Sequence, residues 1–248
     1  MNKLILSLAL FAIPFLTQAK EPIRSRMQAF VDEHVIAGSV TVVADKNNIF
    51  SLQTTGYANL TTKEPMRSDH LFWIASMTKP MAAVCVLQIK EEGKLSIDDP
   101  VEKHLPEFKG QWVVKKREGG KLILKRAERA ITIRDLLTHT SGLANTGTPR
   151  HESTLGELVM SYSKTPLNFE PGSKWSYSNA GINTLGRIVE VVSGIPFAQF
   201  LQKRILDPCG MKDTTFWPTP AQARRVAKSY RPDKNGELQP VDVRVLPG

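Results

Sequence analysis

The chain has 248 residues, of which 41% are hydrophobic and 23% charged, a composition that indicates a globular protein and argues against a disordered one. The formal net charge is +9, and part of this excess lies in a basic stretch over 115–129. Beyond the N-terminal segment no apolar stretch is long enough to cross a bilayer, which argues against a membrane-spanning domain.

The N-terminal segment has the pattern of a secretory signal peptide. Lys3 provides a short basic start, residues 4–16 are almost all apolar, and Ala19 is a small residue suited to cleavage. The apolar run is short for a spanning helix, so cleavage is favoured over a permanent membrane anchor. We therefore expect a signal peptide over 1–19, a periplasmic or secreted mature protein, and no stable membrane insertion after cleavage.

Residues 24–34 carry apolar side chains at helical spacing and predict the first helix of the mature chain. Two stretches of strand-forming residues follow, over 38–44 and 49–55, with a polar turn between them. This arrangement predicts a β-hairpin.

Residues 76–92 have a helix-compatible composition, and Pro80 falls early enough in this segment to be tolerated. An apolar face that includes Met81, Val84 and Cys85 predicts that the helix is buried. Cys85 is then a core residue, whereas Cys209 lies in a turn, so we expect two free thiols even in an exported protein.

The basic stretch predicts a second hairpin, with strands over 111–114 and 122–124 on either side of a glycine pair. Its lysines are typical of a solvated edge hairpin. An anionic cell-envelope polymer is the alternative partner for this charge. No aromatic platform or nucleic-acid motif accompanies the charge, so we expect no nucleic-acid binding.

The second half of the chain predicts mainly helices. Thr132 and Asp135 form a capping-box pattern at the start of a short helix that ends near 141–142. Residues 175–181 form a polar loop. Three more helices are predicted, over 154–163, 182–194 and 197–206.

The candidate catalytic residues begin with Ser76 and Lys79. A serine hydroxyl needs a nearby base to attack a carbonyl, and a lysine three residues further along a helix can reach it. The same spacing recurs at Ser161 and Lys164, where a polar helix ends before a proline and solvated side chains are expected. Ser76 instead precedes an apolar helix, whose N-terminus favours developing negative charge. A simple capping serine and a surface lysine are the alternative reading.

Tyr177-Ser178-Asn179 supplies a second candidate group, in a loop that leads into a strongly apolar helix. A tyrosine there is suited to act as general base if a lysine lowers its pKa, and Asn179 is suited to hydrogen-bond a substrate carbonyl or the lysine. The alternative is a packed tyrosine and a helix-capping asparagine. The similar Tyr57-Ala58-Asn59 follows a glycine at a strand end and is interpreted as a hairpin exit.

Taken in order, Ser76-x-x-Lys79, residues 136–143 (Leu-Leu-Thr-His-Thr-Ser-Gly-Leu) and residues 171–179 resemble the serine β-lactamase-related hydrolases. The tyrosine that begins the second motif points to the branch with class C β-lactamases, D-alanyl-D-alanine carboxypeptidases, D-aminopeptidases and carboxylesterases. The resemblance implies an α/β (α+β) β-lactamase/transpeptidase-like fold, with a helical region packed on an antiparallel sheet.

The resemblance also implies roles for particular residues. Ser76 is the acylated nucleophile, Lys79 and Tyr177 manage its proton, and Asn179 binds a small-molecule or peptide substrate. His139 is a structural residue satisfied by hydrogen bonds. The other histidines are scattered without ligand spacing, so we predict no metal site and no cofactor.

The sequence departs from the family pattern in its third element, a Lys-Thr-Gly or His-x-Gly strand that contributes an oxyanion-hole N–H. Lys234-Asn235-Gly236 is the candidate, but Asn-Gly between polar residues predicts a turn. We expect residues 20–248 to form an incomplete catalytic domain that lacks the third motif and the C-terminal strands. The hairpin over 38–55 would then expose its edges, and the oxyanion would have one donor fewer.

Two functions follow from these observations. The first is an exported serine hydrolase that acts on an ester, amide or β-lactam through an acyl-Ser76 intermediate. The second is a catalytically silent, truncated homologue that acts as a cell-envelope binding module through its basic surface.

Overall fold

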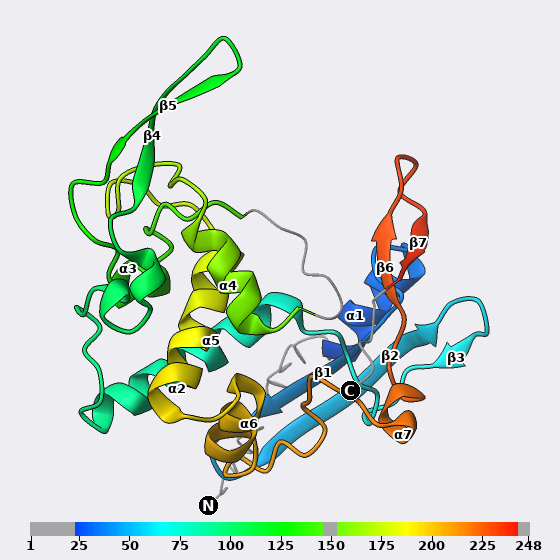
Figure 1. Ribbon diagram of the computed structural model, residues 1–248. Helices are drawn as coiled ribbons and strands as arrows, with labels where there is room; N and C mark the ends of the chain where they lie inside the picture. Colours follow the sequence, from blue (N-terminus) through cyan, green and yellow to red (C-terminus); the bar gives the residue numbers. More distant parts are fainter. Residues whose placement is uncertain (1–22, 146–152, 243–248) are drawn as a thin grey trace, which may run out of the picture. The chain divides into compact units, whose positions relative to one another are not determined.

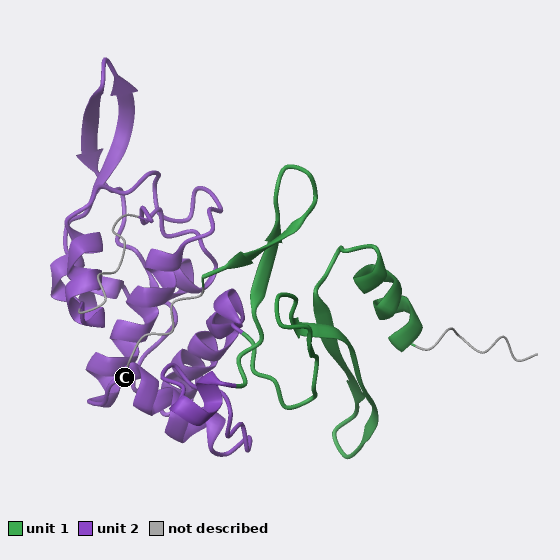
Figure 2. Ribbon diagram, turned by 90° about the vertical axis from the view of Figure 1, so that its right-hand side faces the viewer, with its two compact units in different colours: residues 1–72, 225–243 green, residues 73–224, 244–248 purple. Residues whose placement is uncertain are grey.

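The computed structural model describes residues 23–145 and 153–242, which form two compact units (Figures 1 and 2). The first unit takes its residues from the two ends of the described chain, up to Phe72 and from Arg225 onward. The second unit contains Trp73–Arg224. The signal peptide predicted over 1–19 lies outside the described residues.

The first unit is built on a three-stranded antiparallel sheet in the order β1-β2-β3, with a separate two-stranded hairpin, β6-β7. Its small hydrophobic core consists of the buried residues Ala58, Met66 and Ala227. The elements of this unit are α1 (Ile23–Asp32), β1 (Gly38–Ala44), β2 (Ile49–Asn59), β3 (Glu64–Pro65), β6 (Ser229–Pro232) and β7 (Leu238–Val241).

The predicted first helix and first hairpin are confirmed, but β2 is longer than expected. It continues through Tyr57-Ala58-Asn59, where Tyr57 pairs with Pro65 of β3. Apolar side chains on the hairpin are exposed, including Ile49 and Phe50 at 66% each. Asn235 and Gly236 lie in the turn between β6 and β7, as the sequence predicted.

The second unit is mainly helical and contains the large hydrophobic core of the described chain. Helices α2 and α5 contribute buried stripes that include Cys85, Ile89, Leu185 and Ile188. The elements of this unit are the 3-10 turns η1 (Ala75–Met77), η2 (Val101–Lys103) and η3 (Pro106–Phe108), the helices α2 (Thr78–Glu91), α3 (Ile133–Leu137), α4 (Leu155–Ser163), α5 (Asn179–Ser193), α6 (Phe197–Leu201) and α7 (Pro220–Ala223), the π-helical segment η4 (Gln202–Leu206), and the strands β4 (Trp112–Glu118) and β5 (Lys121–Arg126).

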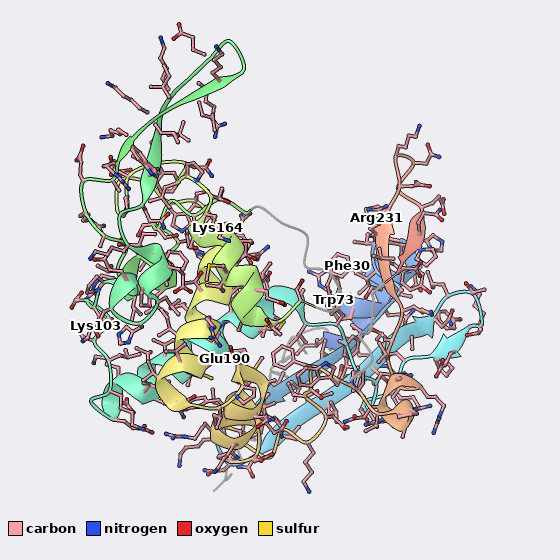
Figure 3. The ribbon with its side chains drawn as sticks, in the orientation of Figure 1. Phe30, Trp73, Lys103, Lys164, Glu190 and Arg231 are labelled. Carbon is pink, nitrogen blue, oxygen red and sulfur yellow. The ribbon has the colours of Figure 1, made fainter. Side chains whose placement is uncertain are left out.

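The buried face of α2 differs in part from the predicted one. Ala82, Cys85, Val86 and Ile89 are buried, at the i, i+3, i+4, i+7 spacing of one helical face, whereas Val84 lies on another face and is 43% exposed. The end of α5 is joined to α6 by Glu190, labelled in Figure 3, whose carboxylate accepts a hydrogen bond from the Phe197 backbone N–H. The helix predicted over 197–206 is observed as α6 and η4.

The basic hairpin is also confirmed, as β4 and β5, and it extends away from the helices of its unit (Figure 1). Two of its lysines have carboxylate partners: Lys116 pairs with Glu118, and Lys125 with Glu128. Lys115 is exposed on the same hairpin.

Both cysteines are free, as expected. Burial raises the pKa of the Cys85 thiol to about 12, so it is inert as a nucleophile at neutral pH. Within residues 23–145 and 153–242, no helix has the length and apolar character needed to cross a membrane.

Candidate active site

Ser76 lies in a tight turn that leads directly into helix α2. The turn η1 covers Ala75–Met77, and α2 begins at Thr78, slightly later than the predicted start at Ser76. Ala75 has a φ of 43°, in the left-handed region that non-glycine residues rarely adopt. Such conformations cluster at functional sites, and here the strained residue immediately precedes the serine. Ser76 itself is exposed rather than enclosed.

Lys79 and Tyr177 both bond to the Ser76 hydroxyl. The Lys79 Nζ donates to Ser76 Oγ at 3.0 Å, which confirms the contact expected from their spacing along a helix. The Tyr177 hydroxyl donates to the same oxygen at 2.6 Å. The Lys79 Nζ also lies 4.7 Å from the centroid of the Tyr177 ring. One serine oxygen is thus held by two groups that can carry a proton.

The electrostatics of this cluster lower the pKa of the Tyr177 hydroxyl. The pKa of the Tyr177 hydroxyl is held below its usual value, mainly by its interaction with Lys79 and next by its hydrogen bond with Ser76. A lower pKa places a larger fraction of Tyr177 in the phenolate form at a given pH. The phenolate can accept the proton that Ser76 must lose to become a nucleophile.

The residues after Tyr177 begin helix α5 earlier than predicted. Ser178 is the N-cap, its Oγ accepting a hydrogen bond from the Gly181 N–H, and Asn179 is already the first helical residue. The polar loop predicted over 175–181 therefore ends at Ser178. Asn179 is exposed, and its hydrogen bond in the structure comes from its backbone N–H rather than from its side chain.

His139 supports Tyr177 from the side. Its ring centroid lies 4.8 Å from that of Tyr177, and its Nδ1 accepts a hydrogen bond from the Ser178 N–H at 3.2 Å. Burial first, and then the charge of Lys79, lower the pKa of His139, so the imidazole is held neutral. His139 also has a left-handed backbone, with a φ of 59°.

A residue that the sequence did not single out, Asn145, contacts the same turn. Its amide nitrogen donates to the Tyr177 carbonyl at 2.9 Å, and its amide oxygen accepts from the Asn179 N–H at 2.8 Å. Asn145 belongs to none of the motifs discussed above. Only the folded chain brings it next to Tyr177.

The segment that carries His139 is fixed by Asp135 in α3. The predicted capping box is present, because Asp135 accepts from the Thr132 N–H while the Thr132 hydroxyl accepts from the Asp135 N–H. Asp135 also forms a two-point ion pair with Arg129, at 2.6 and 2.9 Å. The Thr140 N–H then bonds to the Asp135 carbonyl, which ties the loop after α3 to the helix.

The second copies of the two motifs, at Ser161 and Lys164 and at Tyr57, lie in ordinary structural settings. The Ser161 hydroxyl donates to the Leu158 carbonyl within α4, and Lys164 caps the C-terminal end of that helix (Figure 3). Tyr57 lies in the strand β2. No group of three or more histidine, cysteine or carboxylate side chains in the described part of the chain is arranged to hold a metal ion.

Residues 23–247 match the family model named Beta-lactamase, and the chain belongs to this family. It has the β-lactamase/transpeptidase-like α/β fold, and the family to which it belongs consists of serine hydrolases with esterase, penicillin-binding and acyltransferase relatives. The chain is 32% identical over 240 residues to esterase EstB of Burkholderia gladioli, covering 89% of this chain and 57% of that protein.

Two solved structures show the same fold. EstCE1, described as a hydrolase with promiscuous acyltransferase activity, matches with a TM-score of 0.74 and 28% identity, over 88% of this chain and 57% of that one. Unliganded simvastatin synthase (LovD) from Aspergillus terreus matches with a TM-score of 0.75 and 27% identity, over 88% and 59%. The chain therefore spans less than two thirds of the length of each of these relatives.

Proposed function

We propose that the protein is an exported serine hydrolase that cleaves carboxylic esters through an acyl-Ser76 intermediate. The observation that carries this proposal is the convergence of Lys79 and Tyr177 on one oxygen, at 3.0 and 2.6 Å from Ser76 Oγ. A nucleophile in hydrogen-bond contact with a base is the arrangement that nucleophilic catalysis requires. Export rests on the signal-peptide pattern over 1–19.

The reaction begins with Tyr177 as the phenolate. Ser76 Oγ forms a bond to the ester carbonyl carbon while its proton passes to Tyr177, and the carbonyl π electrons move onto the oxygen. Collapse of this tetrahedral species breaks the bond to the alcohol, which leaves with the proton from Tyr177. Water then attacks the acyl-Ser76 ester in the same way and releases a carboxylic acid. Lys79 stabilises the negative charge that moves between Ser76 and Tyr177.

An ester is favoured over an amide or a β-lactam because the similar proteins include an esterase and a hydrolase with acyltransferase activity. Apolar side chains next to the catalytic residues in the sequence are exposed: Met77 at 70% and Trp175 at 68%. Such a surface suits an apolar acyl group. The similar proteins are longer than this chain, so the choice of an ester as substrate is proposed rather than taken from them.

The experiment is labelling with a fluorophosphonate probe, followed by turnover of a p-nitrophenyl ester and of a chromogenic cephalosporin. We expect labelling and ester turnover, both lost in Ser76→Ala. The matched control is Ser161→Ala, which removes the serine of the second Ser-x-x-Lys sequence and should leave both intact. Labelling that survives Ser76→Ala would overturn the proposal. Faster turnover of the cephalosporin than of the ester would show that the preferred substrate class is a β-lactam.

The alternative function, a cell-envelope binding module, is supported by the exposed cations of the β4–β5 hairpin. It expects no labelling at Ser76 but salt-sensitive binding to an immobilised polyanion such as polyglutamate. Replacing Lys115 and Lys121 by glutamine should weaken that binding, whereas the same change at Lys109 and Lys203, exposed elsewhere in the unit, should not. Ester turnover that depends on Ser76 would exclude a catalytically silent module.

A further inference from the structure

The side chain of Asn145 bonds to four consecutive residues that include Tyr177. Its Nδ2 donates to the Tyr177 carbonyl at 2.9 Å. Its Oδ1 accepts from the N–H groups of Asn179 and Ala180, at 2.8 and 3.1 Å, and lies 3.4 Å from the Ser178 hydroxyl. A single amide therefore spans the turn from the candidate base to the second residue of α5.

The partners of Asn145 fix the orientation of its amide group. The oxygen faces two N–H groups and a hydroxyl, while the nitrogen faces a carbonyl, so the flipped amide would place donors against donors. Asn179 and Ala180 open helix α5, and the first N–H groups of a helix have no partner within it. Asn145 satisfies two of these groups from outside the helix.

Helix α5 does not depend on Asn145 alone for its start. Ser178 caps it through the Gly181 N–H at 3.0 Å, and a buried apolar stripe anchors it in the core. The bond to the Tyr177 carbonyl has a different effect, because it holds the backbone of the residue whose hydroxyl contacts Ser76. A displacement of about 1 Å at a reacting group can lower a rate about 100-fold.

We infer that Asn145 is a positioning residue for acylation, holding the backbone of Tyr177 so that its hydroxyl lies against Ser76. Asn145 contacts Tyr177 through the backbone and takes no part in the proton transfer itself. The role of Asn145 in acylation rests on the proposed function. The geometric part, the placement of the Tyr177 hydroxyl beside Ser76 and Lys79, is testable without any turnover.

The test uses the full chain labelled with [13Cζ]tyrosine, in which the Tyr177 signal is assigned by its loss in Tyr177→Phe. In the wild type the signal should titrate below the range of free tyrosine, because Lys79 and Ser76 lower the pKa of this hydroxyl. In Asn145→Ala the titration should move upward towards free tyrosine. Fluorophosphonate labelling of Ser76 should slow by about 10- to 100-fold in the same variant.

The matched control is Asn183→Ala. Asn183 lies within α5, and its Nδ2 donates to the Tyr162 hydroxyl at 3.0 Å. It removes a comparable hydrogen bond from α5, so it reports a purely structural loss. We expect the Tyr177 titration and the labelling rate to stay within about twofold of the wild type in this control, after both variants are compared at the same fraction folded.

Three outcomes distinguish the possibilities. If the Tyr177 titration is the same in Asn145→Ala as in the wild type, the inference is overturned. If the titration moves but the wild type is never labelled, the proposed function fails and the placement of Tyr177 by Asn145 stands.

The third outcome involves a second variant, Asn145→Ser, which loses the amide donor but keeps a polar atom. If neither variant folds, Asn145 is a stability residue and the positioning role is rejected.

Discussion

Tyr177 donates a 2.6 Å hydrogen bond to Ser76 although 101 residues separate the two in the sequence. The two residues come from different elements, Ser76 from the turn before α2 and Tyr177 from the residues before α5. These helices pack in one core, with Cys85 and Leu185 both buried in it. The distance between nucleophile and base is therefore set by helix packing and not by a local motif.

Replacing Tyr177 by phenylalanine removes the hydroxyl and keeps the ring. Loss of a general base typically lowers the rate by 10²- to 10⁴-fold, so we expect kcat/KM for an ester to fall by about that factor. The side chain is 41% exposed, so the melting temperature should change little. Steady-state kinetics and calorimetry check the two parts. A loss of less than about fivefold would assign the base role to Lys79 instead.

Replacing Lys79 by glutamine tests the electrostatic role of the lysine through the pH profile. The interaction with Lys79 is the first cause that lowers the pKa of Tyr177, so its removal should raise that pKa. The rate of Ser76 acylation increases with pH as Tyr177 loses its proton, and the midpoint of this increase should therefore move to higher pH in Lys79→Gln. Lys90→Gln, near the other end of α2, is the control and should leave the midpoint in place.

The local parts of the site could be predicted from the sequence. The contact between Ser76 and Lys79 depends on a three-residue spacing, and the capping box of Thr132 and Asp135 depends on residues three apart. Helical geometry alone brings such pairs together. The approach of Tyr177 to Ser76 followed only from the family resemblance, since no spacing determines a tertiary contact.

Other features could not be read from the sequence because they depend on packing or on backbone conformation. Asn145 contacts α5 across more than thirty intervening residues, and it lies just outside the motif over 136–143. The left-handed backbone of Ala75 has no sequence signal, because alanine does not favour it. Val84 was expected to be buried as an apolar residue, but the packed face of α2 excludes it.

Replacing Asp135 by asparagine tests the support beneath His139. Asp135 is 5% exposed and binds Arg129 and Thr132, so loss of its charge should lower the free energy of unfolding by about 2–3 kcal/mol. Its pKa is lowered in the folded state by the Arg129 hydrogen bond and by Thr132, although burial opposes this. The stabilisation is therefore complete above the unfolded pKa near 3.8 and is lost as the pH falls below it.

Urea denaturation of Asp135→Asn at neutral and acidic pH measures both effects. The control is Asp98→Asn, whose carboxylate pairs with Arg134 on the surface, where both side chains are more than half exposed. Exposed ion pairs contribute little, so this variant should resemble the wild type. Equal losses in the two variants would show that Asp135 has no special role in stability.

Replacing Gly142 by alanine tests the backbone between His139 and Asn145. Gly142 has a φ of 77°, and an added Cβ would meet the carbonyl of Phe169. Gly93 has a similar φ of 72° but open space around it, so Gly93→Ala reports the backbone strain alone, about 1 kcal/mol. We expect Gly142→Ala to lose clearly more stability, and also to slow Ser76 labelling. Similar losses in chemical denaturation would mean that the loop relaxes around the new methyl group.

Replacing His139 by asparagine, alanine or phenylalanine separates three properties of this residue. Asparagine tolerates the left-handed backbone and offers an amide oxygen where Nδ1 accepts from the Ser178 N–H, but it lacks the ring. Phenylalanine keeps a ring against Tyr177 but has no acceptor. If the Nδ1 acceptor matters more than the ring, His139→Asn should retain most of the Ser76 labelling rate, while the phenylalanine and alanine variants should lose it.

The pH dependence of stability checks the protonation state of His139. Its pKa is lowered in the folded state, first by burial and then by Lys79, from the usual value of 6.5. The unfolded chain therefore binds the proton more readily, so this stabilisation is complete above about pH 6.5 and declines as the pH falls below it. The asparagine variant cannot titrate there, so the decline in its free energy of unfolding between pH 7.5 and 5.5 should be smaller than in the wild type. An equal decline in both proteins would show that His139 is not the group held neutral beside Tyr177.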